Sequence, residues 1–226
     1  MKWSSFPSAE EQAKHLALAV SQDLVSGLQQ KDIVTLCVPG GSTPALFLNY
    51  LSQASLDWSR VQIVLNDERW VSLNDSLSNE AMLRSTLLQN EAVDAQIVSL
   101  FDHNLPIDQA VRKFNQRITA VLPLDVCVLG MGEDGHTASL FPAMEHLAEA
   151  LDLNQPPVLV IAQVPHKTEQ RVSFNLSALL SAQHHYVLIK SETKQNIIKE
   201  ASQAKSEHLP ISHLLAATNA NIYYTD

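Results

Sequence analysis

Apolar residues in this chain occur in two patterns that alternate along the sequence. Short continuous runs rich in β-branched residues predict buried strands at 33–38, 61–65, 96–100, 126–129, 158–164, 171–175, 186–189 and 222–224. Amphipathic stretches fall between most of these runs, as at 106–121 and 192–203. Apolar strands separated by helices indicate an α/β fold whose sheet is largely parallel and covered by helices on both faces.

Local signals place the starts of two helices. Ser8 with Glu11 three residues later forms a capping box, so a first helix is expected from there to about Gln29. Strand 33–38 is followed at once by a glycine turn, after which Thr43 can cap a second helix and Pro44 can be its first residue. The predicted order here is strand, glycine loop and helix.

Polar segments follow several of the predicted strands. Ligands of open parallel sheets bind at the carboxyl ends of the strands. Segments 40–43, 66–69 and 130–136 each follow a strand, so we expect them to converge on one crevice. With 226 residues and neither a linker nor an internal repeat, the chain is expected to form a single domain over 1–226 with one such site.

Acidic residues outnumber basic ones, with 24 Asp and Glu against 15 Lys and Arg and a net charge of -9. This balance argues against a nucleic-acid partner, which requires a basic face. An anionic substrate would have to be held by a few local cations against the overall field. Arg69, Arg171 and Lys194 are the candidates.

The cysteines and the apolar runs indicate in which cellular compartment the protein is expected. The two cysteines, Cys37 and Cys127, each lie in an apolar run, which indicates neither a disulfide framework nor a thiol cluster for a metal. The amino terminus lacks the apolar core of a signal peptide, and no run approaches the ~18 apolar residues of a membrane span. We therefore expect a cytoplasmic protein with no membrane partner.

Segment 40–44, GGSTP, is a candidate phosphate site. Gly40 and Gly41 leave backbone amides exposed next to the hydroxyls of Ser42 and Thr43, an arrangement that can hold a phosphate without a metal. The alternative is a tight strand-to-helix turn that binds nothing. The Gly-Lys-Ser/Thr ending of a nucleotide-binding P-loop is missing.

Segment 66–71, NDERWV, places two carboxylates, Asp67 and Glu68, beside Arg69. A solvated salt bridge of little energetic value is one interpretation. The position directly after a buried strand favours the other, in which Arg69 clamps a phosphate or stabilises an oxyanion with its planar fork of donors.

The most informative segment is 130–142, GMGEDGHTASLFP, which follows the predicted strand ending at residue 129. Its glycines let the backbone approach a ligand, and Asp134 is close enough to His136 to orient the ring and stabilise its charged form. A lone histidine is more often structural, but its place in a glycine loop after a strand favours a general base. The glycine spacing also fits a dinucleotide fingerprint, which Pro142 disfavours because it cuts the following helix short.

Other catalytic and metal-binding patterns are missing from the sequence. There is neither a G-x-S-x-G nucleophile elbow nor an H-E-x-x-H zinc helix. His184 and His185 are adjacent, and adjacent residues of a strand point to opposite faces, so a shared metal is not expected.

Taken in order, the segments PGGSTP, NDERWV, Ser78-Asn79, GMGEDGHTASLFP, RVSFN and the later Lys194 resemble the 6-phosphogluconolactonase family, within the superfamily that includes glucosamine-6-phosphate deaminase/isomerase. The resemblance spans most of the chain. It implies a Rossmann-like α/β fold and neither a metal nor an organic cofactor. The implied activity is hydrolysis of 6-phospho-D-glucono-1,5-lactone to 6-phospho-D-gluconate, a step of the oxidative pentose phosphate pathway.

The resemblance also implies a role for each matching residue. His136 is similar to the catalytic base, with Asp134 beside it, and Arg69 to the active-site arginine. The implied contacts to substrate and phosphate come from Gly40, Gly41, Ser42, Thr43, Asp67, Arg171 and Lys194. Ser191 and Gln195 stand where a glycine and an alanine are common, so Lys190 is an alternative to Lys194 as the phosphate lysine.

Two rival functions share parts of this pattern. An aminosugar-phosphate deaminase/isomerase is disfavoured because Arg69 stands where that enzyme resembles a tyrosine, and because segment 140–142 lacks an acidic residue. A non-catalytic sugar-phosphate sensor is disfavoured because no helix-turn-helix segment precedes the first strand. The expected partner is a small sugar-phosphate lactone, and the expected state is a monomer or a weak homo-oligomer.

Overall fold

A computed structural model describes residues 1–102, 104–164 and 169–226 and contains two sheets. The larger is seven-stranded, and all its neighbouring strands are parallel. Its order is β1 (Lys2–Ser5), β10 (Asn221–Thr225), β9 (His184–Lys190), β6 (Val126–Leu129), β2 (Val34–Val38), β3 (Val61–Leu65) and β5 (Gln96–Val98). The α/β fold with a largely parallel sheet, expected from the apolar runs, is confirmed.

The smaller sheet is antiparallel, with the order β4 (Asp67–Arg69), β8 (Arg171–Phe174) and β7 (Leu159–Ala162). Strands were predicted at 158–164 and 171–175, but their apolar runs carry no signal that they leave the main sheet. β4 was not predicted as a strand at all, because its residues are all charged. The chain passes from the large sheet to the small one at Asn66, the residue between β3 and β4.

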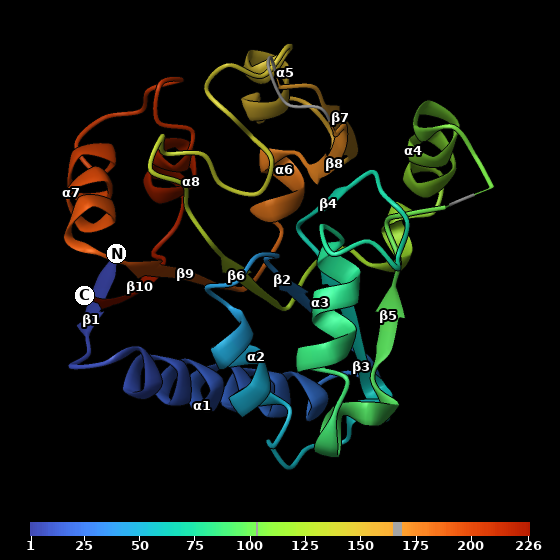
Figure 1. Ribbon diagram of the computed structural model, residues 1–226, viewed down its shortest axis with the longest axis vertical. Helices are drawn as coiled ribbons and strands as arrows, with labels where there is room; N and C mark the ends of the chain where they lie inside the picture. Colours follow the sequence, from blue (N-terminus) through green and yellow to red (C-terminus); the bar gives the residue numbers. More distant parts are fainter. Residues whose placement is uncertain (103, 165–168) are drawn as a thin grey trace.

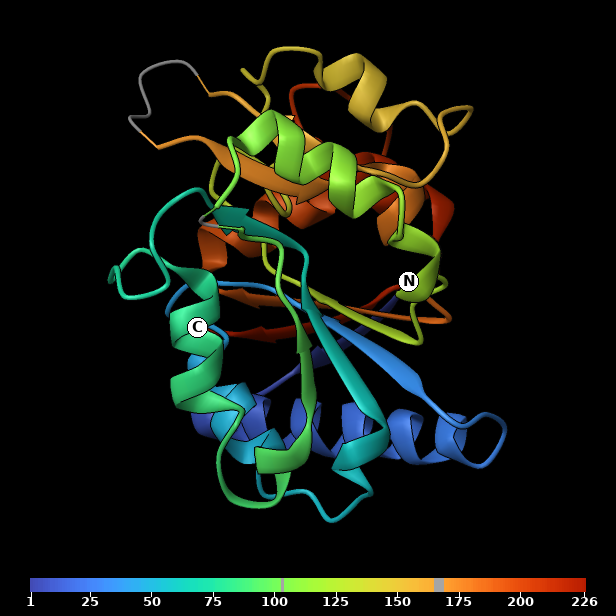
Figure 2. The same cartoon turned by 90° about the vertical axis from the view of Figure 1, so that its right-hand side faces the viewer.

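Helices cover the large sheet on both sides, in two layers (Figures 1 and 2). The lower layer in these views holds α1 (Ala9–Leu28) and α2 (Ala45–Leu51), with α3 (Asn79–Thr86) beside them. The upper layer holds the small sheet with α4 (Ile107–Asn115), α5 (Leu147–Leu151), α6 (Leu176–Leu179), α7 (Glu192–Ala201) and α8 (Ile211–Ala217). Short 3-10 helices lie at Trp58–Arg60, Asn90–Asp94 and Ile118–Ala120.

The first two helices test the predicted caps. The Ser8 side chain accepts a hydrogen bond from the Glu11 backbone nitrogen at 3.2 Å, and α1 begins at Ala9, as the capping signal predicted. The helix ends at Leu28, close to the expected end at about Gln29. The expectation that Thr43 caps the second helix is wrong. Pro44 is itself the cap of α2, with no side-chain hydrogen bond, because the turn continues for one residue more and leaves the Thr43 side chain exposed.

The first strand was missed from sequence. β1 pairs in parallel with β10 and forms the edge of the large sheet, and its burial pattern runs from exposed through intermediate to exposed. A four-residue edge strand that contains polar residues has no continuous apolar run from which it could be predicted.

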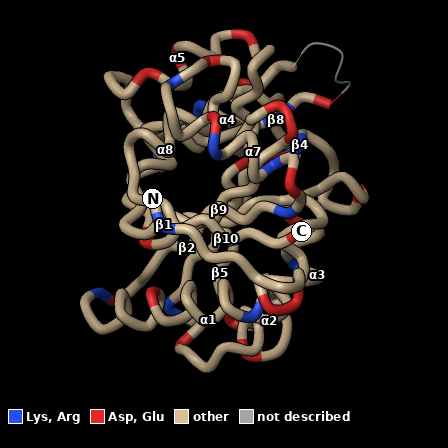
Figure 3. The backbone as a smooth tube through the Cα atoms, turned by 90° about the vertical axis from the view of Figure 1, so that its left-hand side faces the viewer, with Lys and Arg blue, Asp and Glu red and all other residues tan. Residues whose placement is uncertain are grey.

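The interior is apolar and the charges are dispersed. β2 and β6 are buried along their whole length, which suits central strands of a parallel sheet. Figure 3 shows the Lys and Arg positions spread over several elements and interspersed with Asp and Glu. Within the described residues, no helix combines the length and the apolar character needed to cross a membrane.

Candidate active site

A pocket of about 230 Å³ lies beyond the carboxyl ends of β2, β3 and β6. The three segments expected to converge all contribute to its wall. Of the predicted site residues, Gly40, Gly41, Ser42, Thr43, Asp67, Arg69, His136, Arg171 and Lys194 line this pocket. Asp134 does not line the pocket, but it is hydrogen-bonded to His136, which does.

Asp134 contacts His136 directly. Oδ1 of Asp134 lies 2.5 Å from Nδ1 of His136 and accepts a further bond from the His136 backbone nitrogen at 3.2 Å. Burial raises the pKa of the Asp134 carboxyl, but hydrogen bonding and charge attraction to His136 outweigh this, so that its pKa lies below the ordinary value. An ionised Asp134 accepts a hydrogen bond from Nδ1–H, which leaves Nε2 as the basic nitrogen of a neutral ring.

Backbone contacts hold the His136 loop in place. The Gly132 backbone nitrogen donates to the His136 carbonyl at 2.9 Å, and the Ile211 nitrogen donates to the Gly135 carbonyl at 3.0 Å. Gly135 has φ of 75°, in the left-handed region that favours glycine. The ring of Phe141 packs against the His136 ring, with centroids 4.1 Å apart, a contact that sequence reasoning did not identify.

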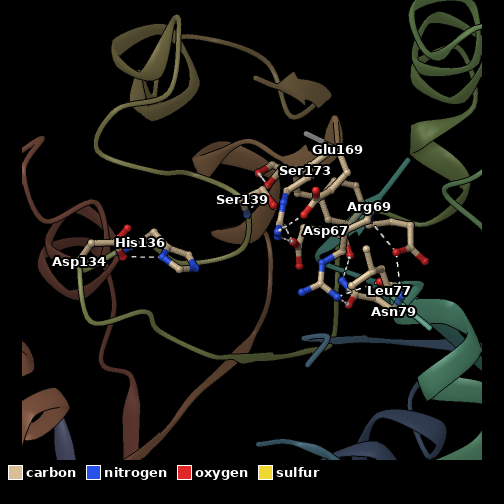
Figure 4. Close-up of polar contacts among 12 residues, drawn as sticks. Asp67, Arg69, Leu77, Asn79, Asp134, His136, Ser139, Glu169 and Ser173 are labelled. Carbon is tan, nitrogen blue, oxygen red and sulfur yellow. Dashed lines mark hydrogen bonds and ion pairs between the residues drawn. The ribbon is translucent and has the colours of Figure 1, made fainter. Parts of the chain in front are cut away.

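Arg69 is held by its neighbours in a fixed position. Its Nη1 donates to the Leu77 carbonyl at 2.9 Å and to Oδ1 of Asn79 at 2.7 Å, and Asn79 donates in turn to the Asp67 carbonyl at 2.9 Å. The buried Nε of Arg69 has no partner among the residues described. Figure 4 shows Asp134 and His136 on one side and Asp67 with Arg69 on the other, with the imidazole directed away from Asp134 toward them.

Glu68 does not form the solvated salt bridge that was the alternative interpretation of segment 66–71. It is 1% exposed, and its carboxylate accepts backbone hydrogen bonds from Arg69, Asn79 and Glu80 at 2.7–2.8 Å and one from the Ser78 hydroxyl at 3.2 Å. Burial raises the pKa of Glu68, and these backbone bonds offset part of the rise. Its structural effect is to fix the start of α3, and with it Asn79 and Arg69.

Arg171 lies beside Arg69, because the two residues are register partners in the antiparallel sheet. Its Nη1 is 3.9 Å from Oδ2 of Asp67, the same oxygen that accepts a 2.6 Å hydrogen bond from the Ser139 hydroxyl. Burial lowers the pKa of Arg171, and Asp67 partly counters that effect. Ser139 thus ties the His136 loop to β4, the strand that carries Arg69 and pairs with the strand of Arg171.

The glycine loop and Lys194 complete the pocket. Ser42 and Thr43 are exposed, and their hydroxyls make no hydrogen bond to any described residue, so both are available to a ligand. Lys194, near the start of α7, lines the pocket and forms no ion pair within the described part of the chain. Lys190 is exposed at the end of β9 and is not part of the pocket wall.

The two adjacent histidines face apart, as predicted. Nδ1 of His184 lies 3.3 Å from Oδ2 of Asp23, whereas Nε2 of the buried His185 lies 3.0 Å from the Leu179 carbonyl. Residues 1–102, 104–164 and 169–226 contain no group of three or more His, Cys, Asp and Glu residues that could hold a metal ion.

The sequence matches one known family over nearly its whole length. The family described as glucosamine-6-phosphate isomerases/6-phosphogluconolactonase matches residues 7–223. A 6-phosphogluconolactonase of Neisseria meningitidis is 33% identical over 99% of both chains. One of Pseudomonas aeruginosa is 35% identical over 93% of this chain and 89% of the relative.

Solved structures show the same fold. A putative 6-phosphogluconolactonase of Neisseria gonorrhoeae superposes with a TM-score of 0.91 and 32% identity over 100% of both chains. A 6-phosphogluconolactonase of Shewanella baltica gives 0.88 and 30%, over 100% of this chain and 97% of the other. A monomeric glucosamine-6-phosphate deaminase gives 0.80 at 17% identity over 100% of this chain and 97% of the other, so the fold by itself does not separate the two activities.

Proposed function

The chain belongs to the family of glucosamine-6-phosphate isomerases and 6-phosphogluconolactonases, and we propose that its pocket hydrolyses 6-phospho-D-glucono-1,5-lactone with His136 as the general base. One observation carries the proposal. The His136 ring is bound through Nδ1 to Asp134 at 2.5 Å, and its opposite edge is directed toward the pocket side that carries Arg69 (Figure 4). A base and a cation therefore flank the space in which an ester carbonyl would lie.

The reaction needs a base, a water molecule and a donor for the developing oxyanion. Nε2 of His136 removes a proton from water, whose oxygen attacks the lactone carbonyl carbon. The carbonyl oxygen takes up the negative charge, which Arg69 or the loop amides stabilise by hydrogen bonding. As the tetrahedral intermediate collapses, the bond between the carbonyl carbon and the ring oxygen breaks. The ring oxygen receives the proton held by His136, and 6-phosphogluconate is released.

We assign the substrate phosphate to the part of the pocket wall formed by Arg171, Lys194 and the 40–43 loop. Arg171 and Lys194 supply positive charge there, and the 40–43 loop supplies amides and the hydroxyls of Ser42 and Thr43. Since the chain carries a net charge of -9, these local groups have to overcome an unfavourable overall field. Binding of the phosphate would then fix the lactone carbonyl near His136.

Local chemistry favours lactone hydrolysis over aminosugar deamination. Isomerisation moves protons between adjacent carbons, which calls for several carboxylates around one histidine. Here Asp67 is bonded to Ser139 and lies near Arg171, and Glu68 is committed to the start of α3. Among the described residues, Asp134 is the carboxylate that contacts His136, which gives one base with one orienting acid.

A direct assay tests the function. Freshly made phosphorylated lactone should yield acid well above the spontaneous background, and a metal chelator should leave the rate unchanged. Glucosamine 6-phosphate should release no ammonia. Ammonia release at a rate comparable to lactone hydrolysis would overturn the assignment, and inhibition by the chelator would overturn the cofactor-free mechanism.

The proposed site is built from one chain. Base, cations and phosphate loop all come from the same protein, so a monomer can be active and only weak self-association is proposed. Sedimentation of the active enzyme at assay concentration tests this, and activity restricted to a stable oligomer would contradict it.

A further inference from the structure

Asn66 lies at the junction of the two sheets, on the wall of the pocket. Its backbone nitrogen donates to the Val38 carbonyl at 3.0 Å, and its carbonyl accepts from the Phe174 nitrogen at 3.0 Å. Its side-chain Nδ2 donates to the Val128 carbonyl at 3.2 Å. Asn66 therefore bonds to β2, β6 and β8 while it follows β3, and it is 0% exposed.

The direction of the Asn66 amide is fixed by its partner. A backbone carbonyl only accepts hydrogen bonds, so the group facing Val128 has to be the amide nitrogen and not the oxygen. Oδ1 then lies on the other side of the amide. It is buried and has no hydrogen-bond partner in the described part of the chain. An unmet buried acceptor is unfavourable, which makes a partner from outside the protein the natural explanation.

The chemistry of that partner follows from Oδ1 being an acceptor alone. A phosphate oxygen or a lactone carbonyl also only accepts, so neither can bond there. Among the described residues, no donor of the protein makes a hydrogen bond to Oδ1, and this includes the Nε atoms of Arg69 and Arg171, which are themselves without partners. Ring hydroxyls are the donors that a sugar-phosphate lactone offers.

We propose that Oδ1 of Asn66 accepts a hydrogen bond from a ring hydroxyl of the substrate, on C2, C3 or C4, and so makes Asn66 a specificity-determining residue. This inference rests on the proposed function, because it takes the sugar-phosphate lactone as the ligand. A site that provides a buried acceptor for a hydroxyl rejects the analogue without that hydroxyl, because the acceptor is then left unpaired. Asn66 would thus select a polyhydroxylated ring and orient it against His136.

The test is a cycle of substrate and protein changes. kcat/KM is measured for the wild-type protein and Asn66→Ala with the parent lactone and its 2-deoxy, 3-deoxy and 4-deoxy analogues. For the parent, Asn66→Ala should lower kcat/KM by about 10- to 100-fold. For one deoxy lactone the same substitution should have almost no effect, because its hydroxyl is already missing. The other two should behave like the parent.

Controls separate this role from a structural one. Asn115→Ala removes another amide that bridges backbone groups, at 2.7 and 2.8 Å from Leu159, outside the pocket wall, and should affect all four lactones equally. Asn66→Asp keeps an oxygen at the Oδ1 position, so its preference among the lactones should match the wild type even if its stability falls. If Asn66→Ala does not fold, Asn66→Ser takes its place in the cycle.

The outcomes are distinct. An equal loss on all four lactones, or no loss on any, would refute the role of Asn66 while hydrolysis of the parent by the wild-type protein still supported the proposed function. If the wild-type protein failed to hydrolyse the parent, the proposed function and this inference would fall together.

Discussion

Gly132 lies so close to His136 that a Cβ atom built on it would stand 2.1 Å from Nδ1 of the imidazole and 2.6 Å from Oδ1 of Asp134. A methyl group there would occupy the space of the hydrogen bond that orients the ring. We expect Gly132→Ala to fold and to lower kcat by about 100-fold, the typical effect of displacing a catalytic group by 1 Å. Steady-state kinetics and the thermal midpoint should be measured together.

Gly130 supplies the control for that substitution. It lines the same pocket, but the nearest atom to an added Cβ would be 3.9 Å away, on Pro39. Gly130→Ala should therefore lose much less activity than Gly132→Ala. Similar losses in the two variants would mean that a methyl group anywhere on this loop is harmful, and that the His136 orientation is not the cause.

His136→Ala should lose about 100- to 10,000-fold in kcat while binding of 6-phosphogluconate as an inhibitor stays nearly unchanged. Asp134→Asn should approach the same loss, because an amide that donates to Nδ1 moves the ring proton to Nε2 and removes the basic lone pair from the reacting side. Near-normal turnover in a folded His136→Ala protein would remove the histidine from the mechanism.

Lys194→Ala should raise KM for the phosphorylated lactone much more than KM for unphosphorylated gluconolactone, since the lost charge acts on the phosphate. Lys190→Ala, which removes an exposed lysine outside the pocket wall, is the matched control and should change neither KM. The reverse pattern would assign the phosphate contact to Lys190, and equal effects of Lys194→Ala on both substrates would remove Lys194 from phosphate binding.

His185 should make folding stability depend on pH. Burial lowers the pKa of His185 from 6.5, and its bond to the Leu179 carbonyl offsets part of that shift. Below the unfolded value the unfolded chain binds a proton that the folded chain excludes, so the free energy of unfolding falls as the pH drops. His185→Gln should flatten the decline in thermal midpoint between about pH 7.5 and pH 5. The exposed His208→Gln should leave that decline unchanged, and an unchanged slope in His185→Gln would refute the assignment.

The large sheet was predictable because its central strands are buried on both faces and therefore read as continuous apolar runs. The strand over residues 61–65 was predicted to the residue. β1 and β4 were not, since β1 is a polar edge strand and β4 consists of charged residues stabilised by tertiary contacts. The split into two sheets also has no local signature, because strand partners are chosen by long-range packing.

The composition of the pocket followed from the rule that loops after parallel strands meet at one edge of the sheet. The sequence could not predict the contacts that hold the pocket side chains in position. Asn79 belongs to the Ser78-Asn79 motif, but its bond to Arg69 depends on how α3 is placed beside β4. Ser139 and Phe141 belong to the most informative segment, yet nothing in their spacing indicates that one binds Asp67 and the other packs on His136.

The residues of the site come from both sheets, and this affects how the protein loses activity on heating. β4 and β8 carry Asp67, Arg69 and Arg171, whereas His136 lies on a loop that leaves β6 in the other sheet. Separation of β4 from β8 would scatter both guanidinium groups and leave the parallel sheet intact. Regions of a protein open with different free energies, and activity follows the least stable part that the site requires. We therefore expect the pairing of β4 with β8 to limit the temperature at which activity is lost separately from the stability of the parallel sheet, so that strengthening this pairing raises that temperature.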